Sequence, residues 1–130
     1  MAKKSIPIHE SLKILSRPYD HNHRITMQSL EVTVQGKIIA VPSDFIYDGA
    51  SVPRAVWSIV GSPFQPEFEG PEIVHRYLYR THAIIGGTRI TRKEADLIFR
   101  ELLAWNNVGP VHRQIMYRGV RLGGWASWKR

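Results

Sequence analysis

The sequence contains no cysteine, no long apolar run and no internal repeat. Without cysteine the chain forms neither disulfides nor thiolate metal sites, so both of these ways of stabilising a small fold are excluded. No apolar run approaches the roughly 18 residues that a membrane-spanning helix needs. Lys3 and Lys4 stand near the start, but no apolar segment follows them, so we expect no secretory signal.

Acidic residues are absent from residues 110–130, which carry five of the seven net positive charges. Such a basic end suits contact with an acidic protein, an anionic membrane or nucleic acid, and it is equally typical of a solvated helix face. No RNA-binding motif with interleaved aromatics, Cys/His finger or helix-turn-helix pattern accompanies it, so nucleic-acid binding is not predicted. The residues predicted to bind a partner are Arg118, Arg121, Trp125, Trp128, Lys129 and Arg130.

Length and composition predict one domain over residues 1–130, because a chain with 43% apolar residues is long enough to bury a single core. Residues 30–34 alternate between apolar and other types, Gln35 and Gly36 supply a turn, and the apolar residues 38–41 follow, which predicts a β-hairpin over 30–41. Residues 44–47 are expected to form a short further strand or an extended entry into the acidic loop that follows. Residues 1–28 are expected to form an N-terminal extension.

Helix signals follow the hairpin, so the predicted class is α+β: a small N-terminal antiparallel sheet and then three to four helices. The expected helices begin at Pro53, Pro71, Thr91 and Val111. Their expected ends are Val60, the Gly86-Gly87 pair, Gly109 and Leu122. Thr91 and Glu94 match a capping box. A loop is predicted over 62–70 and an extended, basic, Trp-containing tail over 123–130.

Apolar spacing predicts the buried face of each of the last two helices. The third helix is expected to bury Ala95, Ile98, Phe99, Leu102 and Trp105. The last helix is expected to bury Val111, Ile115 and Val120.

A polar cluster is predicted where an acidic loop and two helices meet. Asp48 lies in the loop, while His75 and Asp96 lie on the second and third expected helices. A histidine base that a carboxylate orients can activate water, so these three are the candidate catalytic residues. They can instead form a hydrogen-bonded brace in which arginines neutralise the carboxylates. The predicted structural network is Asp48, Arg54, His75, Arg76 and Asp96.

A metal site is a further alternative. His75 and His82 are seven residues apart, so on a helix they lie on nearly one face. With Asp96 or Asp48 they would offer two imidazoles and one carboxylate to a transition metal. No short ligand motif accompanies them, so neither a metal nor another cofactor is predicted.

Three segments, at residues 48–53, 75–79 and 92–96, form a pattern when taken together. Their sequences, Asp-Gly-Ala-Ser-Val-Pro, His-Arg-Tyr-Leu-Tyr and Arg-Lys-Glu-Ala-Asp, resemble the motifs of a bacterial and bacteriophage family of unknown function. Those motifs are Asp-Gly-Ala-Ser-x-Pro, His-Asp-Tyr-Leu-Tyr and Arg-Lys-x-Ala-Asp, so Arg76 stands where the family has an aspartate. The segment Met116–Gly124 is also similar to the family's closing segment. The resemblance covers roughly residues 30–125, and it implies the family's fold and a frequent phage context.

The histidine and aspartate on neighbouring helices also resemble the secretory phospholipases. That resemblance implies that His75 activates a water and that Asp96 orients the imidazole. In those enzymes an aspartate beside the histidine holds calcium, but Arg76 stands at that position here, and its charge repels a divalent cation. Calcium-dependent lipase action is therefore not predicted.

The favoured hypothesis is a bacteriophage virion protein of the tail or baseplate region, made in the cytoplasm of the host bacterium. It would bind other virion proteins in a symmetric multi-copy assembly, without catalysis. This hypothesis is favoured by the family resemblance, by the basic tail and by Arg76, which stands where a calcium-binding aspartate would be needed for lipase action. The alternative is a small hydrolase, phospholipase-like or metal-assisted, with a His75–Asp96 dyad that Asp48 or His82 assists.

Overall fold

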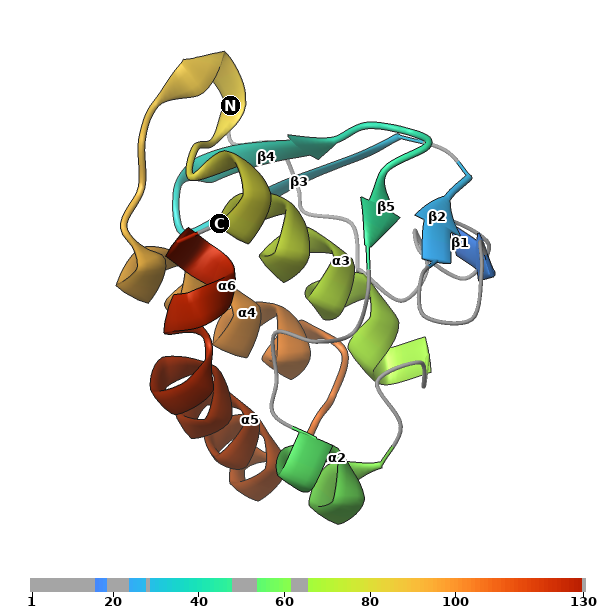
Figure 1. Ribbon diagram of the computed structural model, residues 1–130, viewed down its shortest axis with the longest axis vertical. Helices are drawn as coiled ribbons and strands as arrows, with labels where there is room; N and C mark the ends of the chain where they lie inside the picture. The colour runs from blue at the N-terminus through green and yellow to red at the C-terminus, as the bar shows by residue number, and fades with distance from the viewer. Residues whose placement is uncertain (1–15, 19–23, 28, 48–53, 62–65, 130) are drawn as a thin grey trace.

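Strands precede helices along the chain in the computed structural model (Figure 1). The structure describes residues 16–18, 24–27, 29–47, 54–61 and 66–129. The strands are β1 (Ser16–Pro18), β2 (Arg24–Thr26), β3 (Leu30–Val34), β4 (Lys37–Val41) and β5 (Ile46–Tyr47). The helices are α2 (Arg54–Val60), α3 (Pro66–Thr81), α4 (Arg92–Trp105), α5 (Pro110–Gly123) and α6 (Trp125–Lys129), with the 3-10 helix η1 (Ile85–Gly87) between α3 and α4. This order confirms the α+β class, with five α-helices in these ranges where three to four were predicted.

Both sheets are small and antiparallel. β1, β2 and β5 form one sheet in the order β1-β2-β5, and β3 pairs with β4 in the predicted hairpin. Gln35 and Gly36 make the hairpin turn with positive φ angles of 52° and 72°, as a type I′ turn requires. Val32 lies opposite Ile39 in the hairpin register. β1 and β2 lie within the expected extension, residues 1–28, so part of that extension belongs to the sheet with β5.

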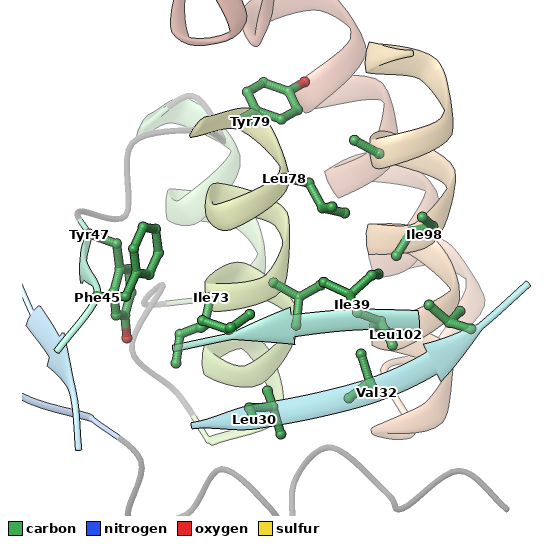
Figure 2. Packing of buried hydrophobic residues seen from close by; sticks show 14 of the residues in the cluster. Leu30, Val32, Ile39, Phe45, Tyr47, Ile73, Leu78, Tyr79, Ile98 and Leu102 are labelled. Carbon is green, nitrogen blue, oxygen red and sulfur yellow. The ribbon is translucent and has the colours of Figure 1, made fainter. Parts of the chain in front are cut away.

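The main hydrophobic core fills the space between the hairpin and the helices α3 and α4 (Figure 2). Ile39 of β4 points toward the helices, while Leu78 of α3 and Ile98 of α4 point into the space between the two helices. All three side chains are completely buried. A second, smaller core joins α2, α3, α4 and α5 and contains Val60, Phe68, Phe99, Leu103, Val108, Met116 and Val120. The two cores hold α3 and α4 at the centre of the described fold.

α3 begins at Pro66 and not at Pro71, so the prediction of a loop over 62–70 was wrong for residues 66–70. Both prolines suit a first helical position, where the missing N–H is not needed, and the sequence alone favoured the second. Pro71 instead lies inside the helix, where it removes one backbone hydrogen bond. The helix ends at Thr81, before the predicted glycine pair, because His82 has a positive φ of 58°.

α4 begins at the predicted capping box. The Thr91 hydroxyl accepts a hydrogen bond from the Glu94 N–H at 3.1 Å, and the Glu94 carboxylate accepts one from the Thr91 N–H at 2.8 Å. The helix ends at Trp105 and not at Gly109, because Asn106 takes the C-cap position. Its predicted face is confirmed, with Trp105 only half-buried and the other four residues completely buried: Ala95, Ile98, Phe99 and Leu102.

The C-terminal segment differs most from the prediction. Val111 was expected in the core but is 69% exposed. It stands five positions before the buried Met116, which places it about 140° around the helix from that residue. The tail predicted to be extended instead forms α6. The ring of Trp128 packs edge-on against Tyr79 at 5.2 Å between centroids, and such a tertiary contact stabilises a helix too short to form alone.

Gly124 stands at the junction of α5 and α6, and its φ of −83° and ψ of −12° suit any residue. A Cβ added there would lie 2.5 Å from both the Tyr79 hydroxyl and the Val120 carbonyl oxygen. We therefore expect Gly124→Ala to lower the free energy of unfolding by about 1–3 kcal/mol through overpacking, measured by urea denaturation.

Gly109→Ala is the control for this substitution, because a Cβ at Gly109 would meet nothing within 4 Å. Gly109 is the N-cap of α5 without a side-chain cap, so its replacement should cost less than about 1 kcal/mol. A Gly124→Ala variant as stable as the wild-type chain would contradict the close approach of α6 to α3.

Candidate functional site

The carboxylate of Asp96 lies at the centre of the polar cluster and is completely buried. Its Oδ1 atom accepts hydrogen bonds from His75 Nε2 at 2.7 Å and from the Tyr79 hydroxyl at 2.6 Å. Its Oδ2 atom accepts one from Arg121 Nη1 at 2.8 Å and a longer one from Arg92 Nη1 at 3.5 Å. Four side chains thus converge on one acid.

Helical spacing explains how most of these side chains meet. His75 and Tyr79 are four residues apart on α3, and Arg92 and Asp96 are four apart on α4, so each pair shares one face of its helix. Arg121 reaches the same carboxylate from α5. The cluster therefore joins the three longest helices of the described chain.

Arg92 also donates hydrogen bonds to carbonyl oxygens at the C-terminal end of α5. Its Nη1 atom donates to the Val120 carbonyl oxygen at 3.0 Å, and its Nη2 atom donates to the Arg121 carbonyl oxygen at 3.2 Å. The Val120 carbonyl also accepts the N–H of the C-cap Gly124 at 2.8 Å. The carbonyls at the end of a helix carry partial negative charge, so a cation is favourable there. Arg92 thus connects the start of α4 with the end of α5.

The surroundings of Asp96 favour its ionised form. Burial by itself raises the pKa of the Asp96 carboxyl, but the hydrogen bonds and charge of its partners, above all His75, outweigh burial and lower it. Burial, followed by the adjacent carboxylate, raises the pKa of the Tyr79 phenol, which therefore stays a neutral donor. Because His75 Nε2 faces an ionised carboxylate, this nitrogen carries the proton and donates it.

The imidazole of His75 is enclosed by aromatic rings. Its centroid lies 4.3 Å from that of Tyr79 and 4.5 Å from that of Phe99, and the side chain is completely buried. The 2.7 Å bond to Asp96 is the geometry that a general base and its orienting acid need. A base must also reach the proton that it removes, and neither His75 nor Asp96 exposes any surface. In this conformation the arrangement braces the helices.

The other residues predicted for the polar cluster have varied outcomes. Asp48 lies outside the described residues, and so does the side chain of Arg54, whose backbone begins α2. Arg76 lies on α3 and is partly buried. The arginines that bond Asp96 in the described chain are Arg92 and Arg121 instead.

His82, the second histidine of the metal-site alternative, contacts the C-terminal helix α6. It lies just beyond the end of α3, where its ring stacks on Trp128 with centroids 3.8 Å apart, and its Nε2 atom lies 2.7 Å from the Trp128 carbonyl oxygen. Among the described residues, no group of three or more His, Cys, Asp or Glu side chains could hold a metal ion.

The predicted partner-binding residues divide into two groups. Arg118 is exposed, and Trp125 is 57% exposed. Arg121 and Trp128 make contacts within the chain, to Asp96 and to His82 respectively. Arg130 and the side chain of Lys129 lie outside the described residues. No described helix is long and apolar enough to cross a membrane.

The sequence reasoning missed three members of the cluster: Tyr79, Arg92 and Arg121. Two of them had a signal, since Tyr79 follows His75 by four residues and Arg92 precedes Asp96 by four. The role of Arg121 had no local signal, because it depends on how α5 packs against α4.

Residues 25–120 match the model of a family described as "Protein of unknown function (DUF1353)", which covers well over half of the chain. The chain belongs to this family. The match supports the resemblance to a family of unknown function. That the segments 48–53, 75–79 and 92–96 are motifs of this family stays a prediction. The segment matched by the DUF1353 family contains His75, Tyr79, Arg92 and Asp96, and Arg121 lies one position beyond it.

A protein of Sinorhizobium fredii (strain NBRC 101917 / NGR234), named "Uncharacterized protein y4jT", is 27% identical to this DUF1353 family member over 89 residues. The aligned part is 68% of this chain and 20% of that protein, so the chain spans about a fifth of the relative's length. No solved structure gives a significant match.

The lowered pKa of Asp96 predicts a dependence of stability on pH in this family member. The native state binds fewer protons at Asp96 than the unfolded state does, so the stabilisation is present above the ordinary pKa of 3.8 and is lost as pH falls through the lower native value. We expect the wild-type chain to be more stable than Asp96→Asn at neutral pH. This difference should shrink below about pH 4.

Urea denaturation of both proteins over a series of pH values measures that difference in free energy of unfolding. Other acids titrate in both proteins and cancel from the comparison. A difference that stays constant from neutral pH into the acid range would contradict an ionised, hydrogen-bonded Asp96.

Proposed function

We propose that this protein is a non-catalytic component of a bacteriophage virion, in the tail or baseplate region, that binds neighbouring protein subunits. It acts in a multi-copy assembly, after synthesis in the cytoplasm of the host bacterium. The observation that carries this proposal is an exposed surface of apolar and basic side chains where α5 meets α6. We call this surface the C-terminal corner and define it by Arg118, Leu122 and Trp125.

The C-terminal corner combines the side chains that protein interfaces use. Leu122 is 81% exposed and Trp125 is 57% exposed, while Arg118 lies one helical turn before Leu122 on α5. Large aromatic residues and arginine are enriched among the residues that dominate binding energy. Exposed apolar side chains beside a cation favour a partner surface with an apolar pocket and an acidic rim.

The position of the corner is fixed by contacts within the chain. The stacking of His82 on Trp128 and the packing of Trp128 on Tyr79 hold α6 against α3. Arg92 holds the end of α5 against α4. A surface that is rigid before binding loses less conformational entropy when a partner docks, which suits a subunit built into a particle.

The buried polar cluster supports a role without catalysis. Asp96 accepts hydrogen bonds from four side chains, and both Asp96 and His75 are sealed from solvent. The polar groups with catalytic potential are thus used to hold helices together. The phage context of the proposal comes from the resemblance described in the sequence analysis.

A small hydrolase is the second candidate, and the 2.7 Å bond between His75 and Asp96 is the observation that favours it. This function requires an opening that brings substrate and water to the imidazole. Hydrolysis of phospholipid or ester substrates by the purified chain, lost in His75→Asn, would establish this candidate and contradict the first.

Particle incorporation tests the proposed function. Phage particles are purified from hosts that supply either the wild-type chain or the double variant Leu122→Ser/Trp125→Ser. We expect the wild-type chain to co-purify with particles and the double variant to be depleted by at least about tenfold, because two anchors of the interface are lost. Quantitative mass spectrometry of the purified particles measures both.

The control is Ile59→Ser/Ile85→Ser, which removes two exposed apolar side chains from α2 and η1 instead. This variant should enter particles at the wild-type level. Absence of the wild-type chain from particles would contradict the virion role. Normal incorporation of the Leu122→Ser/Trp125→Ser variant would contradict the assignment of the interface to the C-terminal corner.

A further inference from the structure

An open groove of about 530 Å³ lies beside the second half of α4 and the first turns of α5. It is lined by the tip of the hairpin and by both helices, through Gln35, Leu97, Arg100, Glu101, Ala104, Trp105, Pro110, Arg113 and Gln114. Its volume lies within the range of about 300–1,000 Å³ that is typical of ligand sites. None of its residues belongs to the C-terminal corner.

Two arginines of the groove are held in place by neutral groups. The Arg100 guanidinium lies over the Tyr117 ring, 4.5 Å from its centroid, and donates to Gln114 Oε1 at 3.4 Å. Arg113 Nη1 donates to the Val108 carbonyl oxygen at 2.9 Å. No carboxylate of the described chain forms an ion pair with either one. Both cations therefore face the groove with their charge not neutralised.

The remaining wall of the groove combines apolar surface with an acid that is already engaged. Glu101 accepts hydrogen bonds from Gln35 Nε2 at 3.2 Å and from Trp105 Nε1 at 3.3 Å. These bonds fix the half-buried indole ring of Trp105 at the groove. Leu97 and Ala104 add aliphatic surface. The groove thus offers a place for an apolar side chain beside two cations.

We propose that this groove binds an acidic peptide segment of a partner protein, in which a carboxylate side chain stands next to an apolar one. The carboxylate pairs with Arg100 and Arg113, whose planar guanidinium groups match a carboxylate with two parallel hydrogen bonds. The apolar side chain packs on Trp105 and Leu97. Because both arginines and the indole are already positioned, little side-chain entropy is lost on binding.

Charge argues against the other occupants. A second copy of this chain carries the same formal charge of +7, which opposes its approach to a basic groove. A nucleic acid gains affinity from many phosphate contacts along a basic stripe, whereas this groove has two arginines and an acid, Glu101. The inference does not depend on the virion role. It concerns the groove and not the C-terminal corner, and it is tested by peptide binding and not by particle incorporation.

The test is selection of short random peptides, displayed by mRNA display, on the immobilised full chain. We expect the enriched peptides to carry aspartate or glutamate next to a large apolar residue. The most enriched peptide is then labelled, and its affinity for the wild-type chain and for Arg100→Gln/Arg113→Gln is measured by fluorescence anisotropy. The double variant should bind at least about tenfold more weakly, since charged hydrogen bonds are lost.

Arg89→Gln/Lys93→Gln is the matched control, because it removes two exposed cations that lie outside both the groove and the C-terminal corner, and it leaves the same net charge as the groove variant. It should bind the peptide with an affinity within about threefold of the wild-type value. A threefold change corresponds to less free energy than the loss of one charged hydrogen bond. If the groove variant does not fold, NMR spectra of the wild-type chain with and without the peptide still locate the binding site. Peptide binding should shift the NMR signal of the Trp105 indole N–H but not those of Trp125 and Trp128.

Three results would overturn the proposal: no enriched peptide, enriched peptides without acidic residues, or an affinity that the groove substitutions leave unchanged. Displacement of the peptide by a single-stranded DNA oligonucleotide that itself depends on Arg100 and Arg113 would assign the groove to nucleic acid instead. Each of these results leaves the particle-incorporation experiment unaffected, so the two proposals fail separately.

Discussion

The ionised carboxylate of Asp96 has no contact with solvent, and a buried charge is tolerated only where donors and opposite charge surround it. Its donors come from all three long helices: His75 and Tyr79 from α3, Arg92 from its own helix α4, and Arg121 from α5. Loss of any one helix from the arrangement would leave part of this charge unsatisfied. Asp96 therefore couples the positions of α3, α4 and α5, beyond the hydrophobic core that also joins them.

Five arginines of α4 and α5 differ in whether they contact the buried carboxylate of Asp96. Arg92 and Arg121 are used inside the fold, where Asp96 and the last carbonyls of α5 accept their hydrogen bonds. Arg100 and Arg113 border the open groove, and Arg118 belongs to the C-terminal corner. His75 and Asp96, the catalytic candidates of the sequence, thus link helices through a buried hydrogen bond, while Arg100, Arg113 and Arg118 lie at or near the surface.

Local patterns predicted most of the fold, because the forces that form the hairpin and α4 act between near neighbours. The alternation of residues 30–34, the Gln-Gly turn after it and the capping box at Thr91 were recognisable without the rest of the chain. The start of α3 at Pro66 was missed because two prolines satisfied the same local rule. α6 was missed because its stability depends on the contact of Trp128 with α3, which no local pattern encodes.

The candidate site was also predicted only in part. A meeting of His75 and Asp96 was expected from two helices that each carry one titratable group, and the structure brings them within 2.7 Å. Their complete burial and the bond from Arg121 depend on how three helices pack, so no local sequence pattern indicates either one.

A double-mutant cycle between Asp96 and Arg121 tests most directly whether this acid unites the helices. The free energy of unfolding is measured for the wild-type chain, Asp96→Asn, Arg121→Gln and the double variant. Residues that share such a contact are expected to show a coupling energy of about 0.5–3 kcal/mol. Additive effects, within about 0.5 kcal/mol, would contradict the account.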